Sequence, residues 1–83
     1  MAPRDLGAVY LRAFGRAVRD RRGAARLSQE DLGFKAGLDR TYVSGIERGV
    51  RNPTLRTIVR LAAALGTDPE GLVASAQALV RRS

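Results

Sequence analysis

The sequence predicts an all-α fold of five helices in a single domain over residues 1–83. Apolar residues recur three and four positions apart, which is the period of an amphipathic helix, and strand-like alternation is absent. Gly, Pro and small polar residues interrupt this pattern at points where one helix can end and the next can be capped. The sequence has no repeat and no linker, so we expect all five helices to share one core.

The first predicted helix extends from about Asp5 to Ala24 and is amphipathic. Its apolar residues repeat every four positions, and they are Leu6, Tyr10, Phe14 and Val18. The opposite face carries Arg12, Arg16 and Arg19. We therefore expect one face to pack on the core and the other to meet solvent.

Two short helices joined by a tight turn are predicted within residues 28–48. The first, about Ser28–Ala36, begins at a hydroxyl that can accept an N–H bond, and acidic residues follow at the positive end of the helix dipole. Gly37 supplies the left-handed conformation that ends this helix, and Asp39 is placed to cap the second one. A turn this short makes the helices cross, which is the geometry that sets the second helix in the major groove of DNA.

The second helix of this pair has two distinct faces. The core face carries Leu38, Val43, Ile46 and Glu47. The outer face carries Arg40, Thr41, Ser44, Gly45 and Arg48. Arginine is the side chain that most often pairs with guanine, so we expect Arg40 to contact DNA; a solvated surface arginine is the alternative. Phosphate contact is the favoured role for Thr41 and Ser44.

Two further helices complete the predicted fold. Thr54 caps the fourth and Gly66 ends it, and the residues expected to point inward are Leu55, Ile58, Leu61, Ala62 and Leu65. Asp68, Pro69 and Glu70 begin the fifth helix, about residues 69–82. Since four helices already close a small core, the apolar stripe of the fifth is predicted to form a dimer interface through Leu72, Val73, Ala76, Leu79 and Val80.

Composition narrows the function classes. The net charge of +7 favours a polyanionic partner. Lys35 is the only lysine among 15 basic residues, which suits a surface that makes bidentate contacts, although a GC-rich genome is an alternative cause of the arginine bias. No Cys or His is present, which removes the usual metal ligands and the commonest general base. No catalytic constellation is found, so we expect neither an enzyme nor a cofactor or metal. No apolar run approaches the roughly 18 residues of a membrane span, and a cytoplasmic location is expected.

The central part of the chain carries a family resemblance. Its residues are Ser28-Gln29, Leu32, Gly33, Gly37, Val43, Ile46-Glu47-Arg48-Gly49 and Arg51-Asn52-Pro53-Thr54. This pattern resembles the Cro/C1-type (XRE) phage-repressor helix-turn-helix family, and Leu38 to Arg48 is similar to the recognition helix of restriction–modification controller proteins. The resemblance implies a lambda-repressor-like fold and a homodimeric transcription regulator of a palindromic operator, which activates and then represses its own operon.

The resemblance also implies roles for individual residues. Gln29 matches a phosphate-contacting glutamine, and Tyr42 matches a DNA-contacting tyrosine, although its ring could instead close the edge of the core. Glu47 lies on the core face, where an unpaired carboxylate would be costly. The family places an arginine near the end of the first helix to pair with it, and Arg22 occupies that position.

The chain departs from the family pattern at two positions. Arg26 stands where Gly is usual in the turn before the helix pair, and Arg21 stands where an apolar residue is common. These departures concern the packing at the end of the first helix.

Three further residues adjoin the predicted reading face. Gly45 has no side chain there, so it either permits close approach of the DNA backbone or is a concession to packing. Arg51 and Asn52 follow the recognition helix in a short loop, where they are candidates for contact with phosphates or the minor groove.

The predicted partners are double-stranded DNA, a second copy of the chain and, for activation, RNA polymerase. An alternative is an antitoxin that neutralises a partner toxin and uses the same fold to regulate its own synthesis. A membrane-surface helix is not expected, because the apolar faces are used by a core of several helices.

Overall fold

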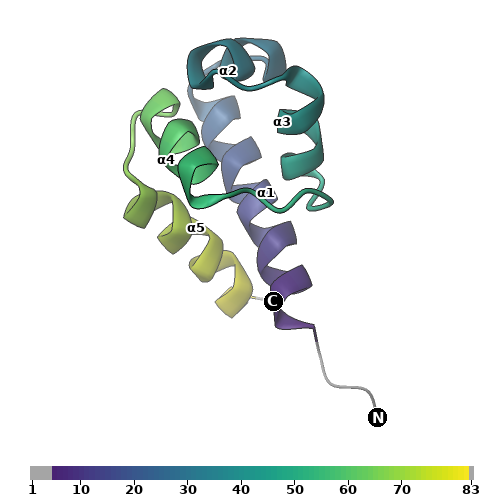
Figure 1. Cartoon of the computed structure of the whole chain (residues 1–83). Helices are drawn as coiled ribbons and strands as arrows, with labels where there is room; N and C mark the ends of the chain where they lie inside the picture. Colours follow the sequence, from purple (N-terminus) through teal and green to yellow (C-terminus); the bar gives the residue numbers. More distant parts are fainter. Residues whose placement is uncertain (1–4, 83) are drawn as a thin grey trace.

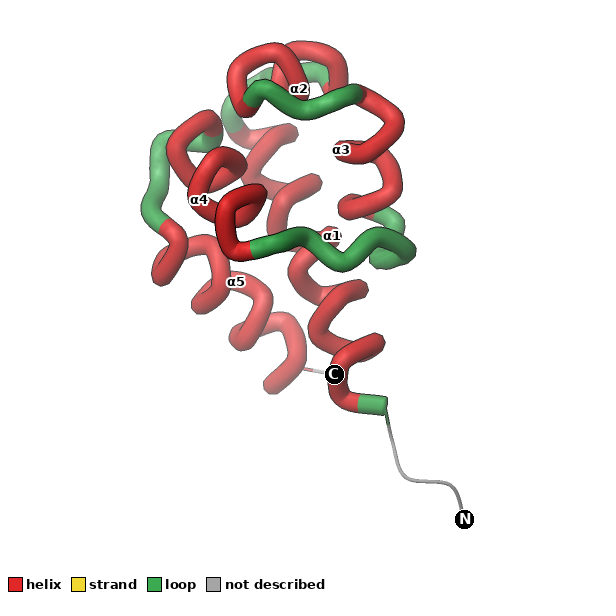
Figure 2. Tube along the Cα trace, viewed as in Figure 1, coloured by secondary structure: helices red, strands yellow, loops and turns green. Residues whose placement is uncertain are grey.

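The computed structural model describes residues 5–82, and these residues form five α-helices and no strand. The helices are α1 (Leu6–Ala24), α2 (Gln29–Ala36), α3 (Arg40–Glu47), α4 (Leu55–Ala64) and α5 (Pro69–Arg82). In Figure 1, α3 and α5 lie beside α1, and α2, at the top, packs against α3 and α4. Figure 2 shows that short loops join the successive helices. The predicted all-α class is confirmed, with the helix-turn-helix pair formed by α2 and α3.

A single hydrophobic core joins the five helices. Each helix contributes a side chain with no exposed surface: Val18, Leu32, Val43, Leu61 and Leu72. Burying a side chain of this size contributes about 1.5–3 kcal/mol relative to leaving it in water. The core therefore fixes how the helix pair sits on α1.

Both ends of α2 form as their residues predict. At the start of α2 the Ser28 hydroxyl accepts the Asp31 N–H at 2.9 Å, and the Asp31 carboxylate accepts the Ser28 N–H at 3.0 Å. The hydrogen bond from the Ser28 backbone N–H, assisted by the Ser28 side chain, lowers the pKa of the Asp31 carboxyl. At the other end Gly37 has a φ of 69°, the left-handed conformation that only glycine adopts without strain.

Asp39 differs from its predicted role. It occupies the N-cap position of α3, but its side chain makes no capping hydrogen bond. Its backbone carbonyl accepts hydrogen bonds from the N–H groups of Tyr42 and Val43, while the residue itself is exposed. The position of the helix start was predicted correctly and the capping contact was not.

The two departures from the family pattern lie at the end of α1 and in the turn that follows it. Arg26 has a φ of 58°, so a residue with a Cβ adopts the left-handed conformation that the usual glycine would supply. Arg21 donates to the Ser75 hydroxyl at 3.0 and 3.3 Å and to the Gly71 carbonyl at 3.4 Å. Arg21 thus ties α1 to α5 by polar contacts.

In α4 the prediction for Leu55 is wrong, because its side chain is 73% exposed. Leu55 is the first residue of the helix and extends past the edge of the core, although it shares a face with Ile58. Thr57 is buried instead, and its N–H donates to the Thr54 hydroxyl at 3.2 Å.

In α5 part of the apolar stripe is buried in the core and part remains exposed. Leu72 and Ala76 are 0% and 2% exposed, so they belong to the core of one chain and are not available to a partner. The prediction that four helices close the core is therefore wrong, because α5 covers α1 along its length. Val73 remains 45% exposed, while Leu79 and Val80 are half-buried.

Candidate nucleic-acid interface

The outer side of α3 is polar and open. Arg40, Thr41 and Arg48 are exposed and Ser44 is half-buried, whereas Val43 and Ile46 on the other side belong to the core. This division follows the three-and-four spacing of the sequence. The core residues hold the helix in place, and the open residues are free to contact a ligand.

The start of α2 joins this open side of α3. Gln29 lies with Arg40, Thr41 and Ser44 around a shallow hollow of about 250 Å³. All four residues were predicted from the sequence as DNA contacts, and the fold brings them to one place. Hydroxyls, an amide and a guanidinium in one hollow are the groups that bind phosphate oxygens and base edges.

A second hollow of about 290 Å³ adjoins the first and adds a residue that the sequence analysis missed. Gln29 and Ser44 line both hollows, and Arg19 and Arg48 bring exposed cations to the second. Arg19 belongs to the arginine face of α1, and the packing of α1 against α3 places it beside α3. The stripe of arginines in α1 was the available signal, but its position relative to α3 depends on the tertiary fold.

This second hollow is also lined by Arg22 and Glu47, which form an ion pair. The guanidinium donates through Nε to Oε2 at 2.6 Å and through Nη2 to Oε1 at 2.9 Å, and through Nη1 to the Leu27 carbonyl at 2.9 Å. The Glu47 side chain is 4% exposed and that of Arg22 is 18% exposed. The hydrogen bond to Glu47 raises the pKa of Arg22, and the bidentate geometry compensates the cost of burying the carboxylate.

Gln29 connects this buried pair to the surface. Its amide Nε2 donates to Oε1 of Glu47 at 3.1 Å, and the same amide carries a second N–H. The bond to Glu47 fixes the orientation of the amide at the edge of both hollows. Gln29 is therefore held in place before any ligand arrives.

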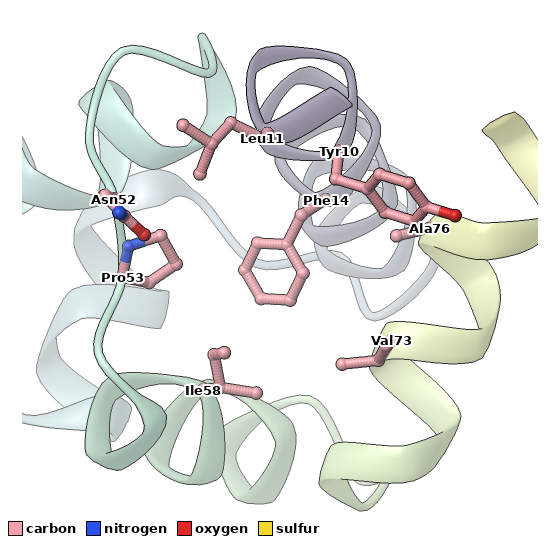
Figure 3. A pocket seen from close by; sticks show the side chains of 9 residues that line it. Tyr10, Leu11, Phe14, Asn52, Pro53, Ile58, Val73 and Ala76 are labelled. Atoms are coloured by element: carbon pink, nitrogen blue, oxygen red, sulfur yellow. The ribbon is translucent and has the colours of Figure 1, made fainter. Parts of the chain in front are cut away.

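The remaining predicted residues separate into two groups. Arg51 lies against α3, with its guanidinium carbon 5.0 Å from the centroid of the Tyr42 ring. Gly45 is buried beneath the Arg51 side chain, so it does not lie on the open face where the sequence placed it. Asn52 instead borders an apolar pocket of about 320 Å³ between α1, α4 and α5, which is drawn in Figure 3.

Residues 5–82 provide neither a metal-binding cluster nor a membrane-spanning helix. No group of three or more carboxylate, Cys or His side chains there could hold a metal ion. None of the helices in that range is both long and apolar enough to cross a membrane.

A family model described as Helix-turn-helix matches residues 18–72, and the chain belongs to this family. Within it the chain is similar to the Control protein C.BamHI of Bacillus amyloliquefaciens, with 46% identity over 61 residues that span 72% of this chain and 75% of that protein. A similar solved structure is the restriction-modification controller protein C.AhdI from Aeromonas hydrophila, with a TM-score of 0.73 and 52% identity over 75% of this chain and 94% of that one. Another is the controller protein C.Esp1396I, solved as a tetramer in complex with its natural 35 base-pair operator. Its TM-score is 0.78, with 30% identity over 86% of this chain and 93% of that chain.

Proposed function

We propose that this protein is a sequence-specific DNA-binding transcription regulator, and that it is the controller protein of a restriction–modification system. The observation that carries the proposal is the convergence of Gln29, Arg40, Thr41 and Ser44 around one hollow at the open side of α3. The net charge of +7 suits the same partner, and the similarity to controller proteins supports the regulatory role. A regulator of this kind acts in the cytoplasm, where the DNA is.

The roles of the contact residues follow from their positions. Arg40, at the first turn of α3, reads a base edge in the major groove. Gln29, Thr41, Ser44 and Arg48 contact phosphates, and Arg19 joins them from α1. Tyr42 and Arg51 contact the DNA at the edge of the interface, whereas Asn52, which borders the apolar pocket, is not assigned a DNA contact. Phosphate contacts fix the register of the helix, and the base contact selects the sequence.

The protein acts as a homodimer on a palindromic operator, because one short reading helix covers only a few base pairs. The proposed interface uses the exposed side of α5 and the neighbouring start of α4. Val73, Leu55 and Val59 are 45%, 73% and 46% exposed, and Val73 lines the apolar pocket of Figure 3 together with Ile58. The half-buried Leu79 and Val80 extend this surface toward the end of α5.

Regulation by such a dimer would switch with occupancy. The first dimer activates the promoter of its own operon by contact with RNA polymerase, and a second dimer bound alongside represses it. This switch from activation to repression is tested by transcription in vitro from a selected operator, measured across a range of protein concentrations. A monotonic decrease would mean repression alone.

The experiment that tests DNA recognition is selection of bound sequences from a random DNA pool at a stated salt concentration. We expect a palindrome with half-sites about one helical turn apart. Binding should weaken with salt at a log–log slope near −7 for a dimer that touches about 8 phosphates. Recovery of unrelated sequences with a slope shallower than about −2 would contradict the proposal and direct attention to a protein partner, such as a toxin.

A further inference from the structure

The loop that follows α3 is folded back onto the helix at one residue. The backbone N–H groups of Val50 and Arg51 both donate to the carbonyl of Gly45, at 3.0 and 3.3 Å. This carbonyl therefore fixes the path of the loop as the chain leaves the recognition helix. Arg51 begins from a defined backbone position and not from a free loop.

The same residue makes room for the Arg51 side chain. A Cβ at Gly45 would collide with Cγ of Arg51, and it would lie 3.4 Å from Cδ and 3.5 Å from Cβ. These atoms belong to the stem of the arginine, near its backbone, so they cannot move aside while the guanidinium keeps its place. Any larger residue at position 45 is incompatible with the observed rotamer of Arg51.

The far end of Arg51 is held by Tyr42. The guanidinium carbon lies 5.0 Å from the ring centroid, within the range of a cation–π contact. Tyr42 and Gly45 are three positions apart on α3 and therefore share a face. Arg51 thus crosses that face with its stem on Gly45 and its charge over Tyr42, and it remains exposed to solvent.

We propose that Gly45 is a positioning residue, which does not touch DNA but holds Arg51 as a fixed extension of the recognition helix, ready to contact the DNA backbone. The inference rests on the DNA-binding function proposed above. An arginine that is already held against the helix loses less side-chain freedom on binding than a mobile one. The absence of a side chain at position 45 therefore acts on affinity through Arg51.

A cycle of four proteins tests this inference: wild type, Gly45→Ala, Arg51→Ala and the double variant, with affinity measured on the selected operator at one salt concentration. Loss of one charged contact should weaken binding about tenfold in Arg51→Ala. Gly45→Ala should cause most of that loss, because its methyl group displaces the arginine. In the Arg51→Ala background, where nothing remains to displace, Gly45→Ala should change affinity by less than about twofold.

The opposite results would overturn the inference. An equal loss from Gly45→Ala in both backgrounds would mean that the backbone at position 45 itself approaches DNA. No loss in the wild-type background would mean that Arg51 is not held there. The matched control is Gly23→Ala, in α1, where a Cβ meets no atom within 4 Å and affinity should not change.

A second measurement, made without DNA, separates this inference from the proposed function. Side-chain protons of Arg51 that lie over the face of the Tyr42 ring should show upfield NMR shifts from the ring current. Gly45→Ala and Tyr42→Leu should each abolish these shifts, while Gly23→Ala should keep them. Normal shifts in the wild type would overturn the positioning even if the operator is bound, and failure to select an operator would overturn the function even if the shifts are present.

Discussion

The helices α3 and α5 are both amphipathic, but their faces serve different purposes. In α3 the outward residues are polar, the inward ones apolar, and the open face is the candidate DNA contact. In α5 the stripe is apolar, yet its most buried members, Leu72 and Ala76, serve the core of a single chain. The difference shows that a polar helix face can be predicted from the sequence to be exposed. An apolar face is predicted to be covered, but the sequence does not show whether the same chain or a second copy covers it.

The largest expected effect separates two adjacent residues of α5. Leu72→Asp should destabilise the fold by more than about 4 kcal/mol, because it places an unpaired carboxylate in the core. Val73→Asp, at a residue that is 45% exposed, should keep the helical content but yield a monomer. Circular dichroism with denaturant and analytical ultracentrifugation check both changes. A dimer that survives Val73→Asp would place the interface elsewhere on the molecule.

The buried side of α3 should give the next largest effect. Glu47→Ala should cost about 3 kcal/mol of folding stability, because it leaves the Arg22 guanidinium without its bidentate partner. Arg22→Ala should cost a similar amount, and the double variant clearly less than the sum. Denaturant unfolding of the four proteins measures the cycle, and strict additivity would argue against coupling. Arg48→Ala, at an exposed position next to Glu47, is the matched control with little effect on stability.

The open side of α3 should affect binding without affecting folding. Arg40→Ala should lose about 1–3 kcal/mol of discrimination at one base position of the operator. Its stability should stay within about 0.5 kcal/mol of the wild type, because the side chain is exposed. Arg51→Ala should weaken all sequences alike. If the ratio of specific to nonspecific affinity is unchanged in Arg40→Ala, then this face does not read bases.

The smallest effect is expected at the turn between α1 and α2, which is part of neither α3 nor α5. Arg26→Gly should stabilise the fold by up to about 1 kcal/mol, because glycine adopts a φ of 58° without the steric conflict of a Cβ. The matched change in the other turn, Gly37→Ala, should destabilise by a similar amount at a φ of 69°. Thermal melts compare the two, and neither should alter operator choice. A loss of stability in Arg26→Gly would mean that the arginine side chain outweighs the backbone strain.

Local features of the structure could be predicted from the sequence better than tertiary contacts could. Caps, turn glycines and the two faces of α3 are local, and the starts of α2, α4 and α5 could be read from Ser28, Thr54 and Pro69. The ion pair of Arg22 with Glu47 followed from the family pattern. Two tertiary features could not be predicted, because they depend on how separate segments of the chain pack. Arg19 lines the same hollow as Gln29 and Ser44, and the Arg51 side chain covers Gly45.

The hydrogen bond from Gln29 to Glu47 has a thermodynamic consequence for the bound state. If Gln29 contacts a phosphate, then its amide belongs at once to the DNA interface and to the buried ion pair. Linkage requires the coupling to be reciprocal: if an intact ion pair raises the affinity for DNA by holding Gln29 in place, then bound DNA must stabilise the pair against opening by the same free energy. Amide hydrogen exchange around Arg22 and Glu47 should therefore slow when the operator is bound, although the Glu47 side chain is almost completely buried.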